Sequence, residues 1–168
     1  MPQYLFVNGA APTTAAVTPI TTGTAIKTLT QVKGVTAVQF KVLAYSFSFD
    51  GSAAATPIRC ELIETGTVFG TVTAAVAADL PCTSDPNGPT STTFFSVGTS
   101  ATGYTATAEG TITASRLLDI PQLVAPTNEL IVQFPLGREP VVNAVSALRM
   151  RVTATAAVLA YAGLLMEV

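Results

Sequence analysis

The chain has 168 residues, of which 49% are hydrophobic and only 11% are charged, and its net charge is −2. This length fits one domain, and eight scattered lysines and arginines are too few for an electrostatic nucleic-acid footprint. The chain has no histidine, which excludes Ser-His and Cys-His nucleophilic pairs and most zinc sites.

Threonine and alanine dominate the composition, with 27 and 26 residues. Threonine suits pleated strands and alanine packs between sheets, but so few charges leave a poorly charged surface. Either much of this surface is covered by copies of the chain or by a larger assembly, or it is a neutral hydroxyl-covered surface that stays soluble.

Residues 1–24 are expected to form an N-terminal arm or a first edge strand. An apolar run at 4–7 is followed by Pro12 and Pro19, which argue against a central strand. The start lacks the basic region and long apolar core of a signal peptide. The longest apolar run, 156–166, is too short for a membrane span of about 20 residues. We therefore expect synthesis in the cytoplasm without export, and no membrane contact.

The most informative stretch is 38–64. Apolar residues occupy even positions in 38–42 and odd positions in 43–49. A slip of one residue turns every side chain to the other face. The pattern thus predicts a β-bulge or bend near Val42–Leu43, or a strand that passes between sheets. Asp50–Gly51 begins a turn, and 58–64 returns as a second alternating strand.

The remaining residues predict short strands separated by turns. Residues 66–80 read as a strand to about Thr73 and then a short helix that ends before Pro81. Residues 81–91 form a loop. Further strands are expected at 92–97, 111–118, 129–134, 147–153 and 158–168.

Residues 25–168 are therefore predicted to form one all-β domain. Its class is a single antiparallel β-sandwich, jelly-roll-like or alternatively immunoglobulin-like, with at most one short helix.

No catalytic, metal or cofactor site is predicted. Glu61 and Glu64 differ in parity, so a regular strand points them to opposite faces. Asp79 and Asp85 lie near a loop where calcium is conceivable, but such pairs are usually solvated turn residues. The chain is expected not to be an enzyme.

The two cysteines do not make a disulfide framework. Cys60 reads as a small buried hydrophobe and Cys82 as a loop thiol, with a bridge between them as the alternative. Tyr104, in a Gly/Thr loop, is the one candidate for an exposed glycan contact.

The run IKTLTQV, the segment FKVLAYSFSFDGSAAATPIRCELIETGT and the phrases GTSATGYTATAEGT and PLGREP resemble small virion proteins of tailed phages that infect actinobacteria. The resemblance covers most of the chain and implies a structural role in the virion. Its first implication is a capsid decoration or cement protein that binds the major capsid protein from outside. Such proteins are commonly trimers, so the resemblance implies a homo-oligomer, with a trimer favoured. Alternatives are a tail-tube or tail-tip subunit and a glycan-binding host-attachment module.

A decoration protein would hold the capsid by many modest contacts that add through effective concentration. We expect these contacts in the N-terminal arm, in the turn 136–140 and on the arginine stripe of 147–153, where arginine suits an interface. The expected contact residues are Tyr4, Leu5, Phe6, Arg138, Glu139, Arg149 and Arg151. Deletion of 1–12 is expected to weaken capsid occupancy without changing the fold.

Overall fold

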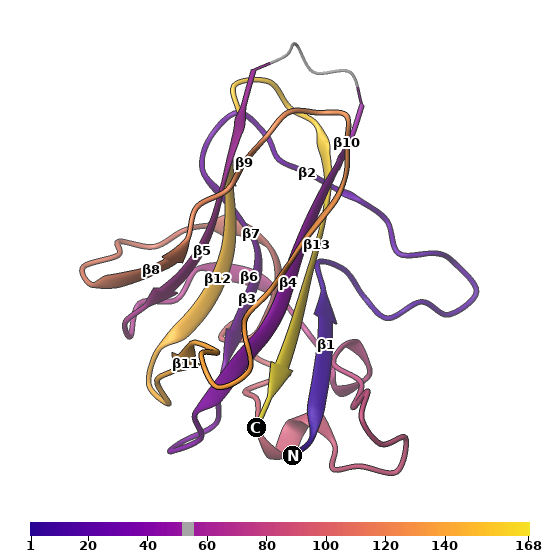
Figure 1. The fold of residues 1–168 in the computed structure, drawn as a ribbon, viewed down its shortest axis with the longest axis vertical. Helices are drawn as coiled ribbons and strands as arrows, with labels where there is room; N and C mark the ends of the chain where they lie inside the picture. Colours follow the sequence, from indigo (N-terminus) through magenta and orange to yellow (C-terminus); the bar gives the residue numbers. More distant parts are fainter. Residues whose placement is uncertain (52–55) are drawn as a thin grey trace.

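The computed structural model describes residues 1–51 and 56–168 and consists of two antiparallel sheets packed face to face (Figure 1). In sheet A the strand order is β1 (Gln3–Val7), β13 (Leu159–Glu167), β4 (Phe40–Asp50) and β10 (Thr127–Gln133), with β2 (Ile20–Thr21) beside β13 and β11 (Val141–Val142) beside β4. In sheet B the order is β6 (Thr71–Ala74), β7 (Gly103–Ala108), β3 (Lys27–Lys33), β12 (Ala147–Thr153), β5 (Ile58–Thr65) and β8 (Ser115–Asp119), with β9 (Gln122–Leu123) beside β5.

Eight of these strands pair from the ends of the chain inwards. β1 pairs with β13, β3 with β12, β4 with β10, and β5 with β8. Successive pairs alternate between sheets A and B, as when one long antiparallel hairpin is rolled up. This is the jelly-roll order. The predicted β-sandwich is confirmed, in the jelly-roll rather than the immunoglobulin-like arrangement.

Helix is almost absent. The described residues contain two single turns of 3-10 helix, η1 (Ala77–Asp79) and η2 (Ser91–Thr93), and no α-helix. None of their helices is long and apolar enough to cross a membrane. β6 followed by η1 matches the predicted strand and short helix before Pro81.

The strand predicted at 92–97 is wrong. This segment starts within η2 and then forms a single bridge between Phe95 and Gly34. The aromatic ring of Phe95 is fully buried at the end of the core, 5.3 Å from the ring of Tyr4 and 5.4 Å from that of Phe40. The apolar residues of this segment therefore close one end of the core and do not form a strand of a sheet.

β4 contains the predicted bulge. Its pairing with β13 shifts register between Leu165 and Met166, whose partners are Ala44 and Val42, so Leu43 is the extra residue. The bulge cancels the slip in the sequence, and the apolar residues on both sides of it point into one core. The buried residues of β4 are Phe40, Val42, Tyr45, Phe47 and Phe49.

The N-terminus begins inside the sheet. β1 pairs with β13 along its whole length, and the side chains of Tyr4 and Phe6 are completely buried between the sheets. Its other edge is covered by residues 81–84, because Leu5 N–H donates to Pro81 O and Thr83 N–H donates to Gln3 O. Deletion of 1–12 would therefore remove part of the core, contrary to the expectation that the fold would survive it.

Replacement of Phe6 by alanine is expected to lower the free energy of unfolding by about 3–5 kcal/mol, the usual cost for a buried phenylalanine. The adjacent Leu5→Ala is the control. It is expected to cost about 1 kcal/mol or less, because the Leu5 side chain points to the outer face and is 39% exposed. Urea denaturation followed by circular dichroism measures both values. Equal losses would contradict the packing of β1 on the core.

Candidate functional site

A groove of about 640 Å³ runs along the outer face of sheet A beside β10. Three of its apolar side chains are largely in solvent: Leu136 is 98% exposed, Met1 77% and Ile131 63%. We call this the outer groove. Its apolar lining residues are Met1, Leu43, Ala44, Ile131, Phe134, Leu136 and Leu165, and its polar ones include Gln3, Lys41, Gln133, Glu139 and Glu167.

The turn between β10 and β11 presents Leu136 to solvent. Arg138 N–H donates to Pro135 O, and Gly137 has φ +80°, a conformation that glycine adopts without strain. The carboxylate of Glu139 accepts the N–H of Gly137 at 3.0 Å. Hydrogen bonds from the backbone N–H groups of Glu139 and Gly137 lower the pKa of the Glu139 carboxyl group. The Glu139 carboxylate that holds this turn is therefore ionised near neutral pH.

Charges around the outer groove are mixed in sign. Lys41 Nζ lies 3.8 Å from Glu167 Oε1 across the β4–β13 pair. The turn between β10 and β11 carries Arg138 and Glu139. An apolar surface ringed by polar residues is typical of a protein contact site.

Three of the predicted contact residues lie at or near this surface. Leu5 is directly opposite Leu165 in the register of β1 and β13, while Arg138 is exposed and Glu139 half-buried in the turn. Tyr4 and Phe6 are fully buried. This fold therefore does not present these two aromatic residues to a partner, because the alternation of β1 turns them inward.

Arg149 is also buried, although it points away from the core. Residues 66–70 and 109–110 lie over the outer face of sheet B at this point. The guanidinium donates to Val68 O at 2.6 Å and to Glu109 O at 2.8 Å, and its Nη1 lies 3.5 Å from a Glu109 carboxylate oxygen. Burial lowers the pKa of Arg149, and the Glu109 charge opposes that change. Arg149 is thus a structural ion-pair residue and not a surface anchor.

Arg151 is nearly as well covered. It lies directly opposite Glu61 in the β12–β5 pair and donates to its Oε2 from Nη2 at 2.6 Å and from Nε at 3.0 Å. Opposite charges at directly opposed positions stabilise a sheet by about 0.2–1 kcal/mol. The charged groups of Arg151 and Glu61 are therefore paired with each other within the chain.

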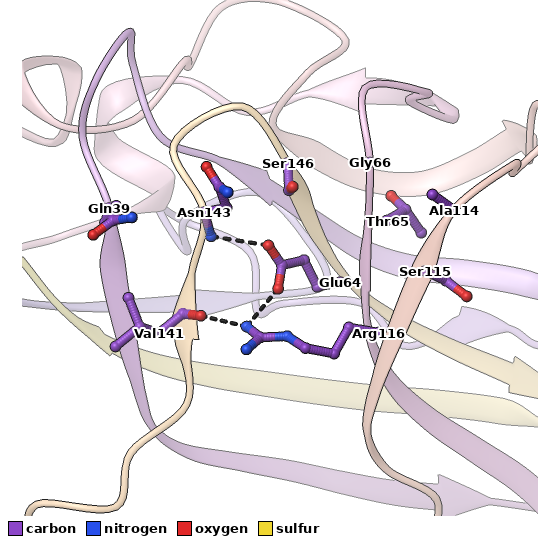
Figure 2. A pocket seen from close by; sticks show the side chains of 10 residues that line it. All are labelled: Gln39, Glu64, Thr65, Gly66, Ala114, Ser115, Arg116, Val141, Asn143 and Ser146. Carbon is purple, nitrogen blue, oxygen red and sulfur yellow. Dashed lines mark hydrogen bonds and ion pairs between the residues drawn. The ribbon is translucent and has the colours of Figure 1, made fainter.

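A second concavity of about 490 Å³ lies where residues from β5, β8 and the segment 141–146 meet. Its lining side chains are shown in Figure 2. Glu64 accepts a hydrogen bond from Asn143 N–H at 2.9 Å and forms an ion pair with Arg116 at 2.5 Å. Arg116 also donates to Val141 O. Glu64 is the one carboxylate in the described lining, and both of its oxygens are engaged.

This pocket therefore lacks the pair of carboxylates that glycoside hydrolysis requires. Glu61 points to the opposite face of β5, as predicted from its parity. Asp79 accepts hydrogen bonds from Ala11 N–H and Val76 N–H. No group of three or more metal-binding side chains occurs among the described residues. Tyr104 is half-buried with its ring 6.5 Å from that of Phe6, so it does not form an open platform for a sugar.

The cysteines are both free thiols in different surroundings. Burial, with a smaller effect of the Glu61 charge, raises the pKa of the Cys60 thiol to about 12. The hydrogen bond with the Ser84 side chain is the main cause that lowers the pKa of Cys82.

The sequence did not single out the apolar residues of the outer groove. Leu136 offered a signal, because an isolated leucine in a turn of Pro, Gly and charged residues has no core to reach. Ile131 offered a weaker signal. β10 is apolar at three successive positions, and because side chains alternate between the two faces of a strand, at least one of the three must face outward. Leu43 and Leu165 gave no comparable signal, because their environment depends on the bulge.

Arg149→Ala is expected to lower the free energy of unfolding by about 3 kcal/mol or more, since it removes the positive charge beside the Glu109 carboxylate and the donor to the Val68 and Glu109 carbonyl groups. Arg151→Ala is the matched control, at about 1 kcal/mol. Chemical denaturation measures both. A stability loss for Arg149→Ala no larger than that of the control would show that its cover is open in solution.

Iodoacetamide near neutral pH is expected to alkylate Cys82 and to spare Cys60. The lowered pKa of Cys82 increases its thiolate fraction, whereas Cys60 stays a buried thiol. Ser84→Ala is expected to raise the pKa of Cys82 and slow its alkylation, and Ser96→Ala serves as the control. Peptide mass spectrometry gives the rates. Alkylation of Cys60 at a rate comparable with Cys82 would contradict its burial.

No family model, curated protein or solved structure matches this chain. Its function is therefore inferred from its own fold and surfaces.

Proposed function

We propose that this chain is a non-enzymatic structural protein of a bacteriophage virion, in first place a capsid decoration or cement protein. The observation that carries the proposal is the outer groove, an exposed apolar surface on a rigid, weakly charged jelly roll. Jelly rolls recur in viral capsid proteins, and the resemblance to small virion proteins of actinobacterial phages points the same way.

The outer groove is better suited to contact with another protein than to catalysis. Its exposed leucine and isoleucine would each contribute about 1.5–3 kcal/mol if fully buried by a partner. The polar pocket of Figure 2, by contrast, has one engaged carboxylate. Stabilisation of a shell by burial needs no cofactor.

The partner in this proposal is the major capsid protein, met on the outside of the shell after synthesis in the host cytoplasm. The outer groove would take an apolar projection of a capsid subunit, and Lys41, Arg138, Glu139 and Glu167 would fix its orientation by complementary charge. Several copies around each shell position would then act together, so that modest single contacts give high occupancy.

A tail-tube or tail-tip subunit is the main alternative. Rings that continue a sheet from subunit to subunit need an open edge on each side, and residues 81–84 cover the β1 edge of sheet A. A glycan-binding module is less well supported, because Tyr104 packs against the core. The decoration role therefore remains the first choice.

Leu136→Asp is expected to weaken binding to capsid shells by about tenfold or more, because it places a charge where a buried leucine contributes at least about 1.5 kcal/mol. The matched control is Val76→Asp, an exposed apolar residue at 57% on the segment before η1. Shells assembled without the chain are mixed with each variant and sedimented. Equal loss or equal retention in both variants would remove the outer groove from the proposal.

The same preparation tests the function itself. The wild-type chain is expected to co-sediment with shells and not with isolated tails. Binding to tails alone would favour the tail alternative, and binding to neither would contradict a structural role in the virion.

A further inference from the structure

The two edges of sheet A differ in their backbone partners. The β1 edge is covered by residues 81–84. β10 ends the sheet on the other side and, among the strands that the structure describes, pairs only with β4 (Figure 1). Within residues 1–51 and 56–168, no backbone group is hydrogen-bonded to the outward edge of its regular stretch, 130–133. Such an edge is a ready template for another strand.

The hydrogen bonds of β10 show which groups point outward. Phe134 N–H donates to Leu43 O, which faces it on β4. Alternation in an antiparallel pair then directs the groups of Val132 and Leu130 towards β4, and leaves the N–H and C=O of Ile131 and Gln133 directed away from the sheet.

Side chains do not protect this edge. Natural edge strands are blocked by lysine, proline, inward charges or cover, whereas residues 130–133 are Leu, Ile, Val and Gln. Sheet B ends in two other edge strands. β6 has four residues with a register shift between Thr71 and Thr73, and β8 carries Arg116 and Asp119 within five residues and has a register shift beside Leu62. The register shift of β10 lies before Leu130, so its stretch 130–133 stays regular. β10 is therefore the edge that is open to pairing.

We propose that β10 pairs antiparallel with β10 of a second copy, across a two-fold axis at Ile131. Outward-directed residues must face outward-directed residues, so Ile131 faces its own copy and each exchanges N–H and C=O with the other. Directly opposed side chains lie on the same side, so the exposed Ile131 packs on its equivalent. Gln133 then faces Glu129 of the copy, an amide opposite a carboxylate, and like charges do not meet.

The pairing would also serve the proposed function. Only this benefit for shell binding rests on the proposed function; the pairing itself does not. A two-fold axis perpendicular to the sheet places the outer faces of both copies on one side of a joined sheet. Ile131 then lies at the seam between the copies, and the rest of both outer grooves, with Leu43, Leu136 and Leu165, faces the same way. Two sites on one rigid platform bind a repetitive shell more tightly than either alone.

The first test is the mass of the protein in solution, by light scattering behind a sizing column. We expect a dimer, at twice the chain mass of 17.2 kDa. Ile131→Lys is expected to give a monomer, because it sets two charges against each other at the axis. Leu117→Lys, at 51% exposure on β8, is the matched control and is expected to stay dimeric, with circular dichroism and thermal unfolding confirming that both variants are folded. A wild-type monomer, a trimer, or a dimer that survives Ile131→Lys would overturn the proposal.

Cross-linking tests the register in the background Cys82→Ser, which removes the accessible thiol. The Cα atoms of a hydrogen-bonded antiparallel pair lie about 5.5 Å apart, within the range of a disulfide. Ile131→Cys is therefore expected to give a covalent dimer on mild oxidation, and Leu117→Cys is not. Cross-linking of Val132→Cys in place of Ile131→Cys would overturn the axis at Ile131.

The pairing and the virion role fail separately. A dimer that cross-links at Ile131 but does not bind shells contradicts the role and supports the pairing. A monomer that binds shells contradicts the pairing and supports the role.

Discussion

β4 pairs with β13 along one edge and with β10 and β11 along the other, so the face on which its side chains lie sets the face of much of sheet A. A regular eleven-residue strand with this sequence would turn either Phe40 or Phe49 into solvent. The extra residue at Leu43 restores the phase, and the aromatic side chains on both sides of it enter one core. The jelly roll depends on that single bulge.

The bulge also shapes the outer surface. It leaves Leu43 on the side away from the core, where it lines the outer groove with Leu165. The turn that follows β10 adds Leu136 at full exposure, held by the glycine at 137 and the cap from Glu139. The outer groove thus combines Leu43, placed by the bulge that completes the core, with side chains from the turn and from β13.

Sheet B differs from sheet A, because its outer face carries charged side chains that are largely buried from water. Arg149 is held beneath residues 66–70 and 109–110 by carbonyl groups and Glu109, and Arg151 is held by Glu61. Removing these charges from water is costly unless each is paired. This cover leaves the outer groove and the β10 edge of sheet A more open than the outer face of β12 in sheet B.

The sequence by itself determined the class of the fold, a break in the alternation near Val42–Leu43 and the turn at 136–140, because alternation and turn chemistry are local properties of the chain. That this break is a bulge at Leu43 came from the structure. It also placed Arg149 and Arg151 on the face of β12 that points away from the core. Only the tertiary structure decided the jelly-roll order and which faces remain exposed. Burial of Tyr4 and Arg149 depends on segments distant in the chain, and so does the open edge at β10, since non-local packing leaves no periodic signal in sequence.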